Sequence, residues 1–194
     1  MSFTRAELES FRDAEVADLI GPGCRLLFVG INPGLWTAAT GAHFARPGNR
    51  FYPALLAAGI IERPIDPTAG MSDADRDHLI ERGVGITNLA SRATAKADEL
   101  TGEELAVGAE RLRTVVRDTT PRVVAVAGIT AYRRAFGERA ARKGKQPRDL
   151  EGAELWLVPN PSGSTPTKPS PRWARRTGRR RSRRESYPAD RAGR

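Results

Sequence analysis

The sequence predicts a single α/β domain with three layers: a mainly parallel central sheet of about four strands, with helices on both faces. Short apolar runs bounded by Gly, Pro and Asn alternate with longer stretches of helical periodicity, which is the pattern of βαβ units. The apolar runs are continuous rather than alternating, which is typical of strands that are buried on both faces of a parallel sheet. We therefore expect helices to cover both sides of the sheet.

The expected elements follow one another in a regular order. The first helix begins at Thr4-Arg5-Ala6-Glu7, which has the form of a capping box, and we expect it to continue to Ile20. The expected strands cover residues 25–30, 85–89, 122–128 and 155–158. The later expected helices cover residues 49–58, 73–82, 102–118 and 129–136, and loops cover residues 32–48, 60–72 and 137–149. The apolar face of helix 102–118 is expected to consist of Leu105, Val107, Leu112, Val115 and Val116.

Two of the expected strands run directly into polar, turn-forming loops, at residues 30–34 and 159–163. Ligands of open α/β sheets bind outside the carboxyl ends of the strands. The fold class by itself therefore predicts that these two loops form the functional site.

The net charge of +9 is concentrated at the C-terminus. Residues 164–194 contain eleven Lys or Arg and two acidic residues, which leaves 21 basic and 21 acidic groups in residues 1–163. The expected domain, residues 1–163, is therefore electrically balanced, and the high net charge says nothing about its site. Residues 164–194 contain no Leu, Ile, Val, Phe or Met, so we expect a basic, disordered tail.

Several function classes lack their sequence signals. No Gly-x-Gly-x-x-Gly follows a strand, there is no P-loop, and one Cys with two His does not supply a common zinc site, so no cofactor or metal is expected. The lone Cys24 forms no internal disulfide and suits the reducing cytoplasm. The first ten residues lack the apolar core of a secretory signal, and no apolar run is long enough to span a membrane.

Two separated motifs resemble those of one enzyme family. Gly30-Ile31-Asn32-Pro33-Gly34, with the block at residues 40–51, resembles the first motif of the mismatch-specific uracil-DNA and thymine-DNA glycosylases, a branch of the uracil-DNA glycosylase superfamily. Asn160-Pro161-Ser162-Gly163 resembles the second motif of the family, and residues 85–89 resemble a third stretch. The resemblance covers residues 1–163.

The resemblance implies a monofunctional DNA glycosylase. Such an enzyme hydrolyses the N-glycosidic bond of uracil, or of a related damaged pyrimidine, in double-stranded DNA, preferentially in G·U or G·T mismatches, and leaves an abasic site. It implies Asn32 as the catalytic residue. An amide takes no proton near neutral pH, but it orients a water molecule by accepting one hydrogen bond and donating another. No lysine lies in either motif, so a Schiff-base lyase step is not expected. We expect a monomer.

The resemblance also assigns contacts to the remaining motif residues. The expected contacts to the flipped nucleotide are Ile31, Thr37, Phe44, Asn88 and Asn160, with the Phe44 ring stacking on the base. The expected contacts to the DNA backbone are Asn49, Arg50, Ser162 and Gly163, the first two at a helix start that favours phosphate.

Each of these residues also has a purely structural interpretation. The asparagines at 32 and 160 could be turn residues, Phe44 could belong to the core, and Asn49 could cap its helix. Arg50 could be solvated or form an ion pair. Thr37 and Asn88 could form only local hydrogen bonds.

The chain departs from the family after the second motif. An apolar residue that wedges into the DNA stack is expected next, but the chain has Ser164, and no final helix with an apolar face follows. One explanation is a natural basic tail that binds DNA phosphates. The other, which we favour because the break falls inside a motif, is a frameshift that leaves the domain without its terminal helix and the enzyme unstable or inactive.

Two further functions stay open on the sequence alone. The first is a non-catalytic nucleic-acid-binding protein that uses the basic tail. The second is a small-molecule enzyme that acts on nucleosides and would cleave free deoxyuridine.

Overall fold

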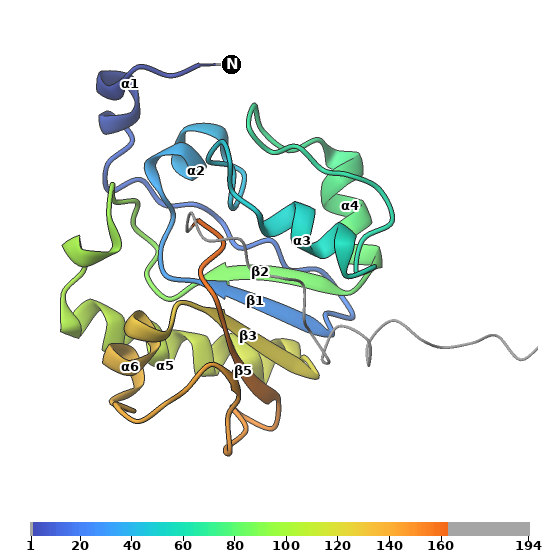
Figure 1. Ribbon diagram of the computed structural model, residues 1–194, viewed down its shortest axis with the longest axis vertical. Helices are drawn as coiled ribbons and strands as arrows, with labels where there is room; N and C mark the ends of the chain where they lie inside the picture. The colour runs from blue at the N-terminus through green and yellow to red at the C-terminus, as the bar shows by residue number, and fades with distance from the viewer. Residues whose placement is uncertain (1, 163–194) are drawn as a thin grey trace, which may run out of the picture.

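The computed structural model describes residues 2–162, which form a sheet between two layers of helices (Figure 1). The strands are β1 (Leu26–Gly30), β2 (Val84–Asn88), β3 (Val123–Ala127), β4 (Gly144–Lys145) and β5 (Glu154–Val158). Their spatial order is β2-β1-β3-β5-β4. The pairs within β2-β1-β3-β5 are parallel, and the short β4 is antiparallel to β5 at the edge. The predicted class and the four predicted strands are confirmed.

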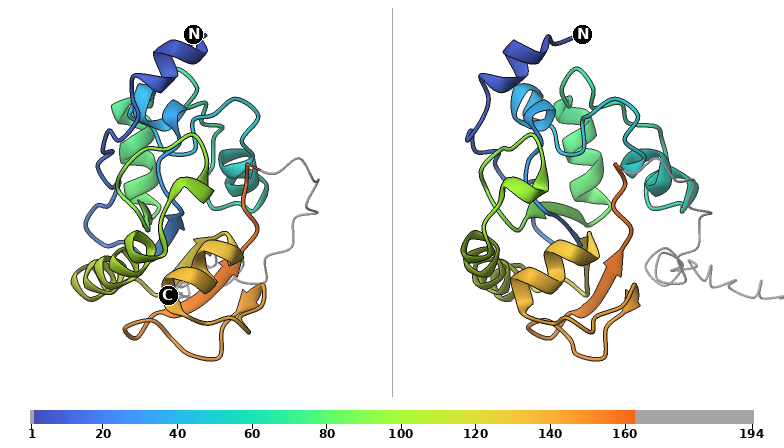
Figure 2. Two further views of the ribbon diagram at one scale, coloured as in Figure 1. Left: turned by 90° about the vertical axis from the view of Figure 1, so that its left-hand side faces the viewer. Right: turned by 60° about the vertical axis from the view of Figure 1, so that its left-hand side comes forward.

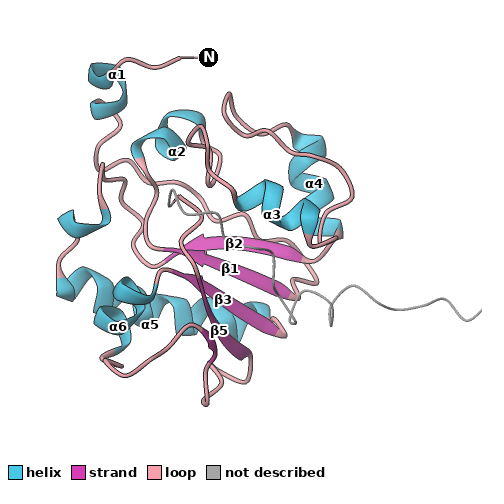
Figure 3. Cartoon of the chain, in the orientation of Figure 1, coloured by secondary structure: helices cyan, strands magenta, loops and turns pink. Residues whose placement is uncertain are grey.

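Helices cover both faces of the sheet (Figure 3). The helices are α1 (Arg5–Glu9), α2 (Leu35–Thr40), α3 (Phe51–Ala57), α4 (Asp73–Glu81), α5 (Gly102–Thr119) and α6 (Ile129–Phe136), with a 3-10 turn at Ala97–Glu99. Figure 1 shows α5 and α6 on one side of the sheet and α3 and α4 on the other. No helix within residues 2–162 has the length and apolar character that crossing a bilayer requires.

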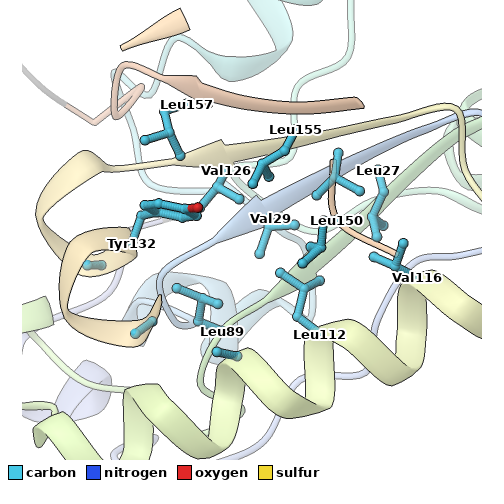
Figure 4. Packing of buried hydrophobic residues seen from close by; sticks show 14 of the residues in the cluster. Leu27, Val29, Leu89, Leu112, Val116, Val126, Tyr132, Leu150, Leu155 and Leu157 are labelled. Carbon is cyan, nitrogen blue, oxygen red and sulfur yellow. The ribbon is translucent and has the colours of Figure 1, made fainter. Parts of the chain in front are cut away.

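Alternate residues of β1, β3 and β5 supply two separate cores. Val29, Val126 and Leu157 point toward α5 and α6, where they pack with Leu112 and Tyr132 (Figure 4). The residues between them point to the other face; Phe28 and Ile86, for example, belong to the cluster that contains Phe51 of α3 and Leu79 of α4. Successive side chains of a strand point to opposite faces, so a strand that is covered on both faces must be apolar throughout. This explains the continuous apolar runs in the sequence.

The first helix is much shorter than predicted. The capping box is present, with the Thr4 side chain accepting from the Glu7 N–H, but α1 ends at Glu9 instead of Ile20. The chain then extends along the outer edge of β2, where Leu19 exchanges two backbone hydrogen bonds with Ile86, at 2.9 and 2.8 Å. Pairing with the sheet therefore overrides helical periodicity in this segment.

Three other expectations were wrong. The predicted loop 32–48 contains α2, and the predicted loop 137–149 contains β4. Val107 is 65% exposed rather than part of the apolar face of α5. Gly108 takes its place, because a Cβ at Gly108 would lie 2.2 Å from the Leu89 carbonyl oxygen. Helix α5 thus packs closely against the chain at the end of β2 through Gly108.

The predicted tail and the missing terminal helix lie outside the described residues. Within the described part of the chain, β5 is covered unequally. Leu155 and Leu157 are buried, whereas Trp156 and Val158, which point to the α3 side, are only half-buried. This face of β5 lacks the complete cover that the other strands have.

Candidate active site

A cavity of about 520 Å³ lies at the carboxyl ends of the parallel strands. Its walls contain residues that directly follow three strands: the loop after β1, Asn88 at the end of β2, and Asn160 after β5. The carboxyl ends of these strands lie together in Figure 2, although the segments are far apart in the sequence. The cavity therefore lies where the two predicted loops meet, as the fold class led us to expect.

Amide side chains are concentrated in this cavity. The chain contains four asparagines, and all four line it: Asn32, Asn49, Asn88 and Asn160. An amide offers both hydrogen-bond donors and acceptors without carrying charge. The cavity can therefore bind a neutral polar molecule with a defined pattern of donors and acceptors.

Asn32 is held in one orientation. Its Nδ2 donates to the Pro33 carbonyl oxygen at 2.8 Å and to Thr94 Oγ1 at 2.7 Å. The Thr94 hydroxyl in turn donates to the Lys96 carbonyl oxygen at 2.7 Å, so it must accept from Asn32. Both amide hydrogens of Asn32 are thus engaged, and its Oδ1 is the atom left to accept a hydrogen bond from a ligand or a water molecule.

Sequence reasoning missed Thr94. This residue is 1% exposed, and it lies in the loop after β2 beside Gly34, with its N–H 3.2 Å from the Pro33 carbonyl oxygen. The loop after β2 follows a predicted strand directly, at the carboxyl end where the site was expected. That position was the available signal, but it does not single out Thr94 among its neighbours.

Asn88 lies against the glycine at the end of β1. A Cβ at Gly30 would lie 2.3 Å from Asn88 Oδ1, so any other residue at this position would displace the amide. Asn88 Nδ2 lies 3.4 Å from Nδ1 of His43, and Nε2 of His43 lies 2.9 Å from the Ala17 carbonyl oxygen. A carbonyl can only accept, so Nε2 carries the hydrogen and Nδ1 accepts from Asn88.

His43 is therefore neutral in the folded protein. It is 4% exposed, and burial lowers its pKa below the ordinary value, against the smaller opposing effect of the hydrogen bond to Ala17. The Tyr52 hydroxyl donates to the backbone carbonyl of His43 at 3.0 Å and fixes the turn that carries it. Sequence reasoning assigned no role to His43, because its partners come from distant parts of the chain.

A cluster of hydrogen bonds and one ion pair, formed with Arg111 of α5, fixes the end of β2. Arg111 of α5 donates to the Asn88 carbonyl oxygen at 2.8 Å and to Thr87 Oγ1 at 3.0 Å. The same guanidinium pairs with Asp18 at 3.0 Å, and Thr87 donates to Asp18 at 2.7 Å. The backbone of Asn88 is thus fixed by side chains from two other segments.

The structure brings the other predicted substrate contacts into the same cavity. Ile31 follows β1 and Thr37 lies on α2, where it is 6% exposed. Phe44 adopts a left-handed backbone conformation with φ of 56°, which is unfavourable for a residue with a side chain. Its ring stacks on Phe51 at a centroid distance of 4.0 Å and also lines the cavity. Phe44 is thus both a core neighbour and a wall residue.

The residues predicted to contact the DNA backbone divide into two groups. Asn49 and Ser162 line the cavity, whereas Arg50 does not and Gly163 lies outside the described residues. Asn49, which precedes the N-cap residue Arg50, accepts with its Oδ1 from the Phe51 N–H at 2.9 Å and so satisfies the first N–H of α3. The Arg50 N–H donates to the Pro161 carbonyl oxygen at 3.2 Å, which ties the first motif to the second.

The second motif forms a tight turn. Asn160 Oδ1 accepts from the Ser162 N–H at 3.1 Å and from the Ser162 hydroxyl at 2.7 Å. Both residues are exposed at the edge of the cavity. In residues 2–162 no group of three or more His, Cys, Asp or Glu side chains lies close enough together to hold a metal ion.

The fold and the cavity define an α/β protein with an amide-lined cavity at the carboxyl ends of its parallel strands. The model of the Uracil DNA glycosylase superfamily matches residues 17–179, and the chain belongs to this superfamily. Its members are DNA glycosylases, which hydrolyse N-glycosyl bonds, so membership implies activity of the uracil-DNA-glycosylase type. The matched segment contains both motifs and continues beyond Gly163.

Proposed function

We propose that this protein is a monofunctional glycosylase that removes uracil, or a related damaged pyrimidine, from DNA, with a preference for G·U and G·T mismatches. The observation that carries the proposal is the geometry of Asn32. Its two amide hydrogens are engaged by Pro33 and Thr94, which leaves Oδ1 to orient a water molecule in the cavity. A neutral amide suits a reaction in which the leaving group carries most of the bond breaking.

In the proposed reaction, the C1′–N1 bond of the nucleotide breaks and its electron pair leaves with the uracil ring. The sugar develops oxocarbenium character, and the oxygen of the oriented water forms the new bond to C1′. One water proton passes to solvent, and the anionic base is released and protonated. The products are free uracil and an abasic site. Water is the nucleophile, because neither motif supplies a lysine amine.

The base pocket is proposed to be formed by Phe44, Asn88 and Thr37. Phe44 would stack on the base, with Phe51 supporting the far side of its ring at 4.0 Å. Asn88 would offer its second amide hydrogen to a pyrimidine carbonyl, because the first is directed at His43. Thr37 would limit the space beside the base. Mismatched pairs are favoured because the base is extruded more easily from them.

The test uses a duplex with a single central G·U pair. The full chain is incubated with this duplex, and abasic sites are then cleaved with hot alkali. We expect strand cleavage by the wild type and its loss, by at least about a hundredfold, in Asn32→Ala, as for removal of a group that acts in the transition state. The matched control is Val107→Ala on the exposed face of α5, which should cleave like the wild type.

Two results would contradict the proposal. The first is salt-sensitive DNA binding without any abasic product, which would indicate a binding protein. The second is cleavage of free deoxyuridine at a rate comparable to that of the duplex, which would indicate a nucleoside enzyme. The mismatch preference is tested separately, by comparing G·U, G·T and A·U duplexes under single-turnover conditions.

A further inference from the structure

One wall of the cavity comes from a segment that precedes the superfamily match. We call residues 2–15 the N-terminal strap; the match begins only at residue 17. Arg5, Leu8 and Glu9 of the strap line the cavity. Helix α1 lies beside α2 at one end of the molecule (Figures 1 and 2). The strap is therefore part of the site in space, although it is remote from the motifs in sequence.

Specific contacts hold the strap to the rest of the site. The ring of Phe3 meets the ring of Trp36 edge-on, at a centroid distance of 5.1 Å. At the other end of the strap, the Asp13 N–H donates to the Ala93 carbonyl oxygen at 2.9 Å, and the Asp13 carboxylate pairs with Arg92 at 2.8 Å. The strap is thereby fixed to the loop that carries Thr94 and Lys96.

The basic residues at the mouth of the cavity form no ion pairs within the described part of the chain, whereas the carboxylate there is paired. Arg5, Arg46 and Lys96 all line the cavity and are exposed, and none of them forms an ion pair within the described part of the chain. Among residues 2–162, the only carboxylate in the lining is that of Glu9, which pairs with Arg12 at 2.7 Å. Arg12 also pairs with Glu99, beside Lys96.

The mouth of the cavity is therefore cationic, although the charges of residues 1–163 balance as a whole. Most arginines elsewhere on the described surface have carboxylate or carbonyl partners, so the free cations at the mouth are available to an anionic ligand. The single carboxylate that would repel such a ligand is neutralised by Arg12. Arg5 and Lys96 approach from the same wall, because the strap is attached to the loop after β2.

We propose that the N-terminal strap is part of the DNA-binding surface, in which Arg5 and Lys96 each contact a phosphate of the strand that carries the target nucleotide. The inference rests on the proposed function in taking DNA as the ligand. A nucleotide that enters the cavity brings its own and the neighbouring phosphates to the mouth, where the two cations lie. Such contacts position the strand without reading its sequence.

The experiment measures how DNA binding depends on salt. The dissociation constant of the full chain for the G·U duplex is determined between about 50 and about 200 mM salt. Loss of one phosphate contact reduces the slope of log K against log salt by about 0.9. We expect this reduction in Arg5→Gln and in Lys96→Ala, and about twice as much in the double variant. For each single variant, the ratio of its Kd to the wild-type Kd should grow about 3.5-fold when salt is lowered from about 200 to about 50 mM.

Two further variants separate charge from packing. Arg5→Lys keeps the charge and should keep most of the wild-type slope, whereas Arg5→Gln keeps a polar but shorter side chain and loses the charge. The matched control is Arg122→Ala, because Arg122 is exposed at the amino end of β3, opposite the cavity. It should leave the slope unchanged. Thermal unfolding of every variant shows whether the strap remains in place.

The outcomes distinguish this inference from the proposed function. If the wild type excises uracil but Arg5→Gln and Lys96→Ala keep the wild-type slope, the strap does not contact phosphate and the inference fails alone. If the two variants lose slope but the wild type makes no abasic product, the glycosylase assignment fails alone. If the wild type does not bind the duplex at all, both fail.

Discussion

The side-chain amide of Asn32 donates a hydrogen bond of 2.7 Å to the hydroxyl of Thr94, 62 residues further along the chain. Because the Thr94 hydroxyl is itself committed as a donor to the Lys96 carbonyl, this bond fixes which end of the Asn32 amide faces the cavity. An amide that rotated by half a turn would present two hydrogens and could not accept from a water. Thr94, together with the Pro33 carbonyl, therefore orients the proposed catalytic group.

Replacement of Thr94 by valine should slow uracil excision. Thr94→Val keeps the shape of the side chain but removes the acceptor, so the Asn32 amide loses one of its two anchors. We expect a loss of about tenfold in the single-turnover rate, which corresponds to about 1.4 kcal/mol, the order of one hydrogen bond. Thr94→Ser, which keeps the hydroxyl, should retain most of the activity. Equal rates in Thr94→Val and the wild type would show that Asn32 does not depend on this bond.

A methyl group at Gly30 should impair base binding through Asn88. In Gly30→Ala the new Cβ would lie 2.3 Å from Asn88 Oδ1, which is the end of a side chain and can move away. We therefore expect a loss of about tenfold in excision, as for one misplaced hydrogen-bonding group, with a much smaller effect on folding. The control is a double-mutant cycle with Asn88→Ala. If the effect passes through Asn88, Gly30→Ala should add little in the Asn88→Ala background; additive losses would contradict this route.

Protonation of His43 should destabilise the protein at mildly acidic pH. The folded pKa of His43 is lowered by burial, so between that value and the ordinary value near 6.5 the unfolded chain binds more protons than the folded one. The free energy of unfolding therefore falls as pH is lowered from about 7 through this window, with a limiting slope of about 1.4 kcal/mol per pH unit.

Urea unfolding at a series of pH values measures this slope. In His43→Gln the slope between about pH 7 and pH 5 should largely disappear, whatever the absolute stability of the variant. The matched control is His78→Gln on α4, which should keep the wild-type slope. The carboxylates with lowered pKa values, such as Glu7 and Glu99, lose their stabilising effect only below about pH 4.5, so they do not obscure the result.

Enlarging Gly108 should destabilise the contact between α5 and the end of β2. The Cβ of Gly108→Ala would lie 2.2 Å from a backbone oxygen of Leu89, which cannot move without shifting the chain next to Asn88. We expect a loss of about 1–3 kcal/mol in the free energy of unfolding. Gly102→Ala at the first position of the same helix is the matched control, because nothing lies within 4 Å of the new atom. It should leave stability unchanged or raise it slightly. Equal effects of the two changes would show that close packing at Gly108 is not limiting.

The sequence by itself determined the four parallel strands of the sheet and predicted the position of the candidate site. The four parallel strands were predictable because each is a short apolar run between turn residues, and α6 was predictable because Gly128 and Gly137 enclose its apolar repeat. These signals are local, so they can be recognised without knowledge of the rest of the chain. The motif containing Asn32 followed from its place after a strand and from its resemblance to a glycosylase motif.

The tertiary structure decided what depends on contacts between distant residues. Helix α1 does not continue to Ile20 because Leu19 pairs with Ile86, and Val107 is exposed because α5 approaches the sheet at Gly108. Thr94 and Arg5 lie in the cavity for the same reason: each is brought there by partners far away in sequence. Such pairings have no local period or spacing, so only folding brings the strap, the loop after β2 and Asn32 into one site.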